Sequence, residues 1–113
     1  MDDTGPSMSE ALYERALKVL PGGVSRNTVL RSPHPVYAAH ATGCHITDVD
    51  GVERIDFANN MASLIHGHAH PAIVTAVADQ MARGTAYTLA TEAEIRYAEH
   101  LCSRNAGFDQ LRF

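Results

Sequence analysis

Apolar residues recur at helical spacing directly after a polar amino-terminal stretch. Ser7, with Glu10 three positions later, has the pattern of a helix-capping box. The apolar positions of the helix that this box would begin are Leu12, Ala16, Val19 and Leu20. Because proline disfavours helix in the residue before it, we expect this helix to stop at Pro21. Residues 1–8 are expected to be a flexible tail.

Two stretches without regular patterning enclose a short region of alternating residues. Residues 21–35 and 59–70 are predicted to be irregular, and segments of that length in a compact domain are usually functional. Between them, residues 36–58 alternate apolar and polar positions and contain an Asp-Gly turn at 50–51. This pattern predicts a small antiparallel meander.

Two further helices are predicted in the second half of the chain. Pro71 suits the first position of a helix, and Thr91 with Glu94 forms a second capping box ahead of a helix that runs to about Arg104. The apolar stripe of the first of these helices consists of Ile73, Val77 and Met81. Residues 110–113 have the pattern of an opening strand. From the residues alone, the chain is an α+β segment with two unusual loops.

Composition and charge exclude several classes of function. The chain has 113 residues, 45% of them hydrophobic, which fits one small domain or a piece of a larger one. Its net charge of -4 argues against nucleic acid as the main partner, because phosphate binding needs a basic face. We expect no membrane span and no secretory signal, and two cysteines make no disulfide framework. A cytoplasmic protein is therefore expected.

Lys18 is the only lysine among nine basic residues. Any chemistry that needs a lysine amine must use Lys18 or a residue that this sequence does not contain. Lys18 follows Glu14 by four positions on the first predicted helix, which is the spacing of an ordinary exposed ion pair.

Two clusters of polar residues are candidates for metal binding. His66, His68 and His70 alternate, and histidine is the commonest metal ligand, but three ligands on one extended strand lie too far apart to close a tetrahedron. We favour a structural role and keep a non-catalytic, His-rich metal-binding module as an alternative. The aspartates of the meander lack the distal glutamate of a calcium loop and are interpreted as turn residues; they are Asp48, Asp50 and Asp56.

Arg26 is the candidate anion-binding residue of the first irregular segment. Small polar residues flank it, and a guanidinium fork matches the two oxygens of a carboxylate or phosphate. The alternative is a solvated surface arginine.

Short motifs along most of the chain, taken together, resemble the glutamate-1-semialdehyde aminomutase branch of the class III aminotransferases. In order, they are residues 11–24, 47–51, 55–57, 67–71, 91–92 and 111–113. The resemblance covers about residues 9–113. It implies an α/β, fold-type-I transferase that depends on pyridoxal 5'-phosphate (PLP), usually a homodimer, with only its N-terminal part in this sequence.

The resemblance also implies a division of the chain. Residues 9–66 would form the N-terminal part of the small domain, with its helix, active-site loop and β-meander. Residues 67–113 would be helices that enter the large PLP-binding domain, truncated at its first strand. The lysine that bonds the cofactor and the aspartate that pairs with its ring nitrogen come later in the family. No catalytic, cofactor-binding or metal residue is therefore assigned here.

One loop departs from the aminomutase pattern. Ser25 and Arg26, followed by apolar residues, look like the β-amino-acid (β-phenylalanine-type) aminotransferases of the same branch, in which the loop arginine holds the substrate carboxylate. Met61 falls where the aminomutases usually have a tryptophan. The resemblance thus implies substrate binding by Arg26, Ser25 and Met61.

The function expected from this resemblance is the transfer of an amino group from an amino acid, with a β-amino acid as one candidate, to a keto acid. The alternative within the branch is a glutamate-1-semialdehyde 2,1-aminomutase. In either case the substrates are expected to be small molecules, and we expect neither nucleic acid nor a membrane as a partner.

Overall fold

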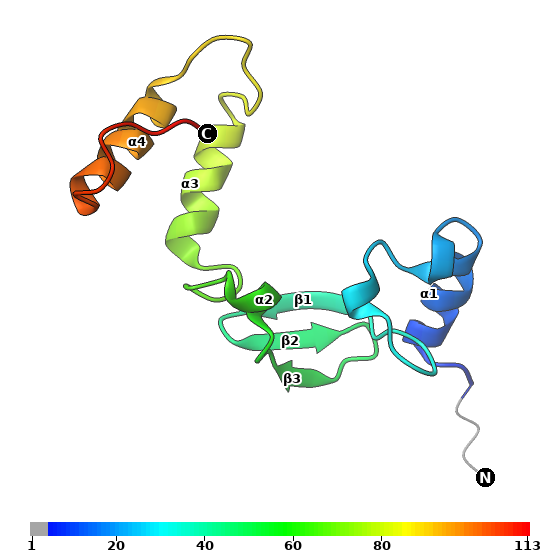
Figure 1. Cartoon of the computed structure of the whole chain (residues 1–113). Helices are drawn as coiled ribbons and strands as arrows, with labels where there is room; N and C mark the ends of the chain where they lie inside the picture. The colour runs from blue at the N-terminus through cyan, green and yellow to red at the C-terminus, as the bar shows by residue number, and fades with distance from the viewer. Residues whose placement is uncertain (1–4) are drawn as a thin grey trace. The chain divides into compact units, whose positions relative to one another are not determined.

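The computed structural model describes residues 5–113, so the first half of the predicted flexible tail, residues 1–4, lies outside the described residues (Figure 1). The chain divides into two compact units, one that reaches to Val74 and one from Thr75 to Phe113. Helix α1 already begins at Met8, within the range predicted for the tail. Among residues 5–113, none of the helices has the length and apolar character that a bilayer crossing requires.

Helix α1 spans Met8–Leu17 and begins as predicted, with the Ser7 hydroxyl accepting a hydrogen bond from the Glu10 backbone nitrogen at 3.1 Å. It ends earlier than predicted. Pro21 holds Leu20 in an extended conformation, so the chain must leave the helix before that residue. Val19 therefore lies beyond the helix and is 78% exposed, while Ala16 is buried.

The first irregular segment is confirmed and contains two short 3₁₀ turns, η1 (Pro21–Gly23) and η2 (Asn27–Val29). The Tyr37 hydroxyl donates a hydrogen bond to the Gly23 carbonyl oxygen at 3.2 Å. This bond ties the start of the segment to the residue that precedes the sheet.

The predicted meander is confirmed as a three-stranded antiparallel sheet in the order β1 (Ala38–Thr42), β2 (His45–Asp48) and β3 (Glu53–Ile55). Asp48 organises the turn between the last two strands, because its carboxylate accepts the backbone N–H groups of Asp50 and Val52 at 3.0 and 2.8 Å. The turn prediction for this aspartate is thereby confirmed.

The second irregular segment contains a short turn that the sequence pattern did not predict. Its residues Asn59–Ala62, labelled α2 in Figure 1, have φ values of 46°, 46°, 61° and 62°. Such values belong to the left-handed region, which residues with a side chain rarely adopt. The segment then returns to the sheet, where Gly43 and His68 form an isolated antiparallel bridge.

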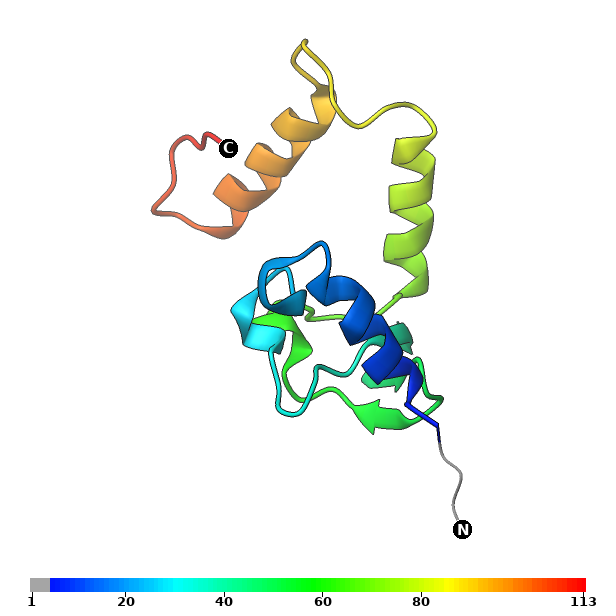
Figure 2. The same ribbon diagram turned by 90° about the vertical axis from the view of Figure 1, so that its right-hand side faces the viewer.

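Helix α3 spans Pro71–Met81, with the predicted proline at its first position, and runs unbroken in both ribbon views (Figures 1 and 2). Its predicted apolar stripe is not buried by the described residues. The exposed fractions are 45% for Ile73, 51% for Val77 and 63% for Met81.

Helix α4 spans Glu92–Arg104, and both hydrogen bonds of the predicted capping box between Thr91 and Glu94 are present. The expected strand at residues 110–113 is not formed. A strand needs a hydrogen-bonded neighbour, and within residues 5–113 this segment has none. Instead, the ring of Phe113 stacks on Tyr97 with 5.2 Å between centroids.

Candidate functional site

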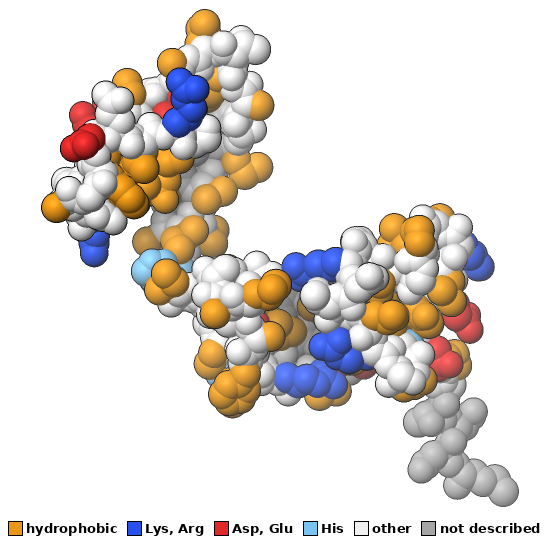
Figure 3. Space-filling view, viewed as in Figure 1, with side chains coloured by type: hydrophobic (Ala, Val, Ile, Leu, Met, Phe, Trp, Pro, Cys, Tyr) orange, Lys and Arg blue, Asp and Glu red, His pale blue; other side chains and the backbone are white. Residues whose placement is uncertain are grey.

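A cavity of about 360 Å³ lies in the first unit, between the loop after α1 and the left-handed turn of α2. Figure 3 shows basic side chains gathered on this unit. The residues that line the cavity are Arg26, Thr28, Val29, Arg31, Val36, Arg54, Ala58, Asn60 and Met61. The cavity therefore combines three guanidinium groups with an amide and a few apolar side chains.

The three arginines differ in their partners. Arg54 forms an ion pair with the Asp48 carboxylate. Arg31 donates to the backbone carbonyls of Thr28 and Leu30 at 3.0 and 2.7 Å. Arg26 donates from Nη1 to Oδ1 of Asn60 at 3.2 Å, and among the described residues it has no carboxylate partner. A guanidinium has five N–H donors, so Arg26 keeps donors for an incoming anion.

The charge of the cavity follows from these pairings. Hydrogen bonds from the Val52 backbone and from Arg54 hold the pKa of the Asp48 carboxyl below its ordinary value, so this group stays negative and offsets Arg54. Within the described part of the chain, Arg26 and Arg31 are bound only to neutral oxygens. The cavity thus has a positive character that suits a carboxylate or a phosphate.

The left-handed turn carries Asn60 into this cavity. The side-chain amide nitrogen of Asn60 donates to the Ser63 hydroxyl oxygen at 3.1 Å, and that hydroxyl donates to the backbone carbonyl oxygen of Asn60 at 2.8 Å. These bonds set which end of the amide faces Arg26. The amide therefore presents its oxygen, and not its N–H₂ group, to the guanidinium.

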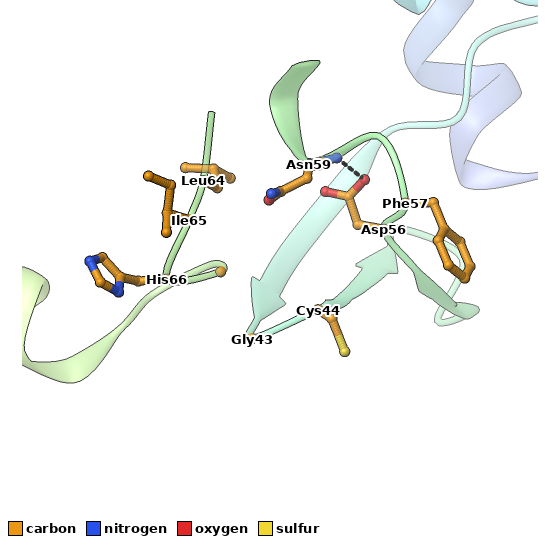
Figure 4. Close-up of a pocket in the computed structure, with 9 residues that line it drawn as sticks. Gly43, Cys44, Asp56, Phe57, Asn59, Leu64, Ile65 and His66 are labelled. Atoms are coloured by element: carbon orange, nitrogen blue, oxygen red, sulfur yellow. Dashed lines mark hydrogen bonds between the residues drawn. The ribbon is translucent and has the colours of Figure 1, made fainter. Parts of the chain in front are cut away.

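An Asp–His pair lies behind the turn. Nε2 of His68 is 2.7 Å from Oδ2 of Asp56, and Oδ1 of Asp56 accepts the Asn59 backbone N–H at 2.9 Å. The His68 ring and then the Asn59 N–H hold the pKa of the Asp56 carboxyl below its ordinary value. Figure 4 shows Asp56 and Asn59 beside each other at the edge of a second cavity, of about 500 Å³.

The histidine cluster does not form a metal site. His68 faces Asp56, while the rings of His66 and His70 lie against each other with centroids 5.3 Å apart. Within residues 5–113, no three His, Cys, Asp or Glu side chains are grouped as metal ligands. The metal-binding module therefore has no geometric support in this structure.

Of the residues predicted for substrate binding, the structure brings Arg26 and Met61 to one cavity, whereas Ser25 is not among the residues that line it. Neither the role of Asn60 nor the Asp56–His68 pair was predicted from the sequence. A signal for the turn was available, because asparagine adopts positive φ more readily than most residues and two occur in succession at 59–60. The contact between Arg26 and Asn60 had no sequence signal.

The model of the family described as aminotransferase class-III matches residues 28–113. The chain belongs to this family. Class-III relatives include a glutamate-1-semialdehyde 2,1-aminomutase of Methanothermobacter thermautotrophicus, 46% identical over 105 residues. The match covers 93% of this chain and 25% of the relative. The chain thus spans about a quarter of the length of the curated relatives it matches.

Two solved structures share the fold of this chain. A transaminase with PLP bound is 53% identical, with a TM-score of 0.85, over 88% of this chain and 24% of that one. A β-phenylalanine aminotransferase from Variovorax paradoxus is 31% identical, with a TM-score of 0.85, over 92% of this chain and 24% of that one. These likenesses confirm the predicted fold, the N-terminal part of a fold-type-I transferase.

Proposed function

We propose that this class-III chain is the N-terminal segment of a PLP-dependent aminotransferase. The complete enzyme would move an amino group from an amino acid, and more specifically a β-amino acid, to a keto acid. The observation that carries the proposal is the guanidinium of Arg26, which lies in a positive cavity and, among residues 5–113, is bound only to the Asn60 amide. The likeness to a β-phenylalanine aminotransferase supports the same substrate class.

The residues of the cavity suit the substrate carboxylate, and they do not include the lysine that bonds the cofactor. No lysine lines the cavity, and Lys18 instead occupies the C-cap of α1. PLP, when bound, supplies an electron sink for the carbanion that forms when the substrate loses a proton. The lysine that such chemistry requires would therefore come from outside these 113 residues.

The task of this segment is substrate positioning. Arg26 would hold the substrate carboxylate through two parallel N–H···O bonds, because its fork matches the two oxygens. A fixed carboxylate fixes the carbon that carries the amino group, and therefore which C–H bond faces the catalytic base. Met61, with 83% of its surface exposed and on the same cavity, would contact the substrate side chain. Ser25 does not line the cavity, so it would affect substrate binding only through its neighbour Arg26.

The extensive apolar exposure of the helices supports the proposal of a larger fold. A stripe with half-exposed Ile73 and Val77 is uncommon on a free surface and is typical of a face that other elements cover.

The family likeness is also the basis for proposing a homodimer. Two free cysteines fit a reducing compartment such as the cytoplasm.

A glutamate-1-semialdehyde 2,1-aminomutase is the second candidate, and the 46% identity to such an enzyme favours it. Met61 in place of the usual tryptophan weighs against it. Dependence on an amino acceptor separates the two, because a transaminase turns over its donor only when a keto acid is supplied, whereas an aminomutase needs none. Turnover without any keto acid would select the aminomutase.

The role of Arg26 is tested by substitution in the complete enzyme. Arg26→Ala should raise the KM for the amino acid donor about tenfold or more, since a charge-assisted hydrogen bond contributes about 1.5–3 kcal/mol. Arg15→Ala is the matched control, because Arg15 is an exposed arginine of α1 that does not line this cavity. An unchanged KM in Arg26→Ala would remove Arg26 from the site.

A further inference from the structure

We propose that Asp56 and His68 are positioning residues that set the orientation of the Arg26 guanidinium through the left-handed turn Asn59–Ala62. The inference rests on the proposed role of Arg26 as the carboxylate-binding residue. Neither Asp56 nor His68 lines the cavity of about 360 Å³ that contains Arg26, so both act through the turn and its residue Asn60.

The turn is a conformation that its own residues do not favour. Its four consecutive non-glycine residues have φ values between 46° and 62°. For residues with a Cβ atom this region is disfavoured, and such backbone persists only where surrounding contacts hold it. Met61 and Ala62 have no short polar side chain that would favour this conformation by local hydrogen bonding. The turn therefore depends on contacts from outside it.

Asp56 supplies such a contact at the start of the turn. Its Oδ1 accepts the Asn59 backbone N–H at 2.9 Å, and its Oδ2 is 2.7 Å from Nε2 of His68. The side chain of Asp56 is only 10% exposed and that of His68 is 22% exposed, so water competes weakly for these bonds. One carboxylate thus joins the first residue of the turn to the segment that follows it.

The sheet in turn fixes His68. Its backbone N–H donates to the Gly43 carbonyl at 2.8 Å, and the Gly43 N–H donates to the His68 carbonyl at 2.9 Å. The preceding Gly67 permits this approach, because a Cβ there would lie 2.7 Å from the Gly43 oxygen. The imidazole is therefore presented to Asp56 from the end of the β1–β2 hairpin.

The far side of the turn faces the proposed substrate. Asn60 is held by Ser63 at its amide nitrogen and accepts from Nη1 of Arg26 at its amide oxygen. A rotation or shift of the turn would move this oxygen and tilt the plane of the guanidinium. A carboxylate bound by two parallel bonds is sensitive to that tilt, whereas a substrate without a carboxylate is not.

The test uses the complete aminotransferase that carries this chain, with an amino acid donor and the matching amine that lacks the carboxylate. His68→Leu should raise the KM for the amino acid by about fivefold or more, with the KM for the amine and both kcat values within about twofold. His68→Gln, whose amide can donate to Asp56, should restore most of the amino acid KM. Equal losses toward both donors would mean a general structural role and would overturn the inference.

A double variant and a binding measurement complete the test. If His68 acts through Arg26, His68→Leu should add no further increase to KM in the Arg26→Ala background. The Kd of a monocarboxylic acid without an amino group, measured by calorimetry, should rise in His68→Leu as the amino acid KM does. A raised KM in Arg26→Ala with an unchanged KM in His68→Leu overturns the positioning role alone. No change in Arg26→Ala overturns the proposed role of Arg26 as well.

Discussion

Oδ1 of Asp50 lies 2.6 Å from the backbone nitrogen of Met8, the first residue of α1, although 42 positions separate them in the sequence. Oδ2 of the same carboxylate accepts the Ser9 N–H at 3.2 Å. The first N–H groups of a helix have no partner within it and carry the positive end of the helix dipole. A carboxylate from the β2–β3 turn therefore holds α1 against the meander.

Loss of this carboxylate should loosen the helix from the sheet. We expect Asp50→Ala to lower the midpoint of thermal unfolding, and Asp50→Asn to lower it less, because the amide oxygen still accepts one of the two N–H groups. Glu14→Ala, an exposed change on the same helix, should leave the midpoint nearly unchanged. Circular dichroism measures the midpoint of each variant. Equal midpoints for Asp50→Ala and the unchanged protein would show that the Asp50 carboxylate does not stabilise the start of α1.

Acid should destabilise the meander region through three aspartates. Hydrogen bonds hold the pKa of each carboxyl below the ordinary value of 3.8. The donors are Val52 and Arg54 for Asp48, Ser9 and Met8 for Asp50, and His68 and Asn59 for Asp56. As the pH falls below about 4, the unfolded chain binds protons before the folded one does, so stability falls until the folded carboxyls are protonated too.

Urea unfolding at about pH 6 and at about pH 3 measures this loss. The stability contributed by the three carboxylates is fully present above their unfolded pKa, so the urea midpoint should drop at the lower pH. Asp48→Asn should be less stable at the higher pH and should lose less on acidification. A midpoint that rises as the solution is acidified would contradict the assigned direction.

Gly67 should not tolerate a side chain. It has φ +73°, and an added Cβ would lie 2.7 Å from the Gly43 oxygen, so Gly67→Ala combines strain with a backbone clash. We expect a loss of about 1–3 kcal/mol or more in the free energy of unfolding. Gly51→Ala is the matched control, because Gly51 has φ +83° and open space around its Cβ position. Equal losses in the two variants would show that the backbone at Gly43 does not lie close enough to Gly67 to exclude a side chain.

Met61 should influence which donors the cavity admits. Met61→Trp would fill part of a cavity of about 360 Å³ and should lower kcat/KM for bulky aromatic donors by about tenfold, with a smaller effect on short ones. Met61→Leu conserves volume and should change little. A panel of donors of increasing size measures the difference, and a uniform change across the panel would count against contact with the substrate side chain.

Local signals predicted the elements of the fold well. Ser7 and Thr91 cap helices, Pro71 begins one, and the Asp-Gly turn at 50–51 joins two strands, as predicted. Each of these signals works through backbone groups within a few residues. The end of α1 was predicted too late, because the constraint of Pro21 on Leu20 sets only the latest residue at which the helix can end.

The contacts of the site could not be predicted in the same way. Arg26 and Asn60 are 34 positions apart, and Asp56 meets His68 across 12. Such pairs depend on how the loop after α1 and the turn after β3 return to the sheet, which periodicity does not encode. The apolar stripe of α3 was correctly placed on one face, but a pattern cannot say which partner covers that face.

The discrimination between an amino acid and its decarboxylated amine tests the central claim most directly. It is the ratio of the two kcat/KM values, measured in the complete enzyme and in its Arg26→Ala variant. If Arg26 binds the substrate carboxylate, the variant should lose tenfold or more of this ratio, with little change in kcat/KM for the amine. A ratio that stays the same in the variant would contradict the account.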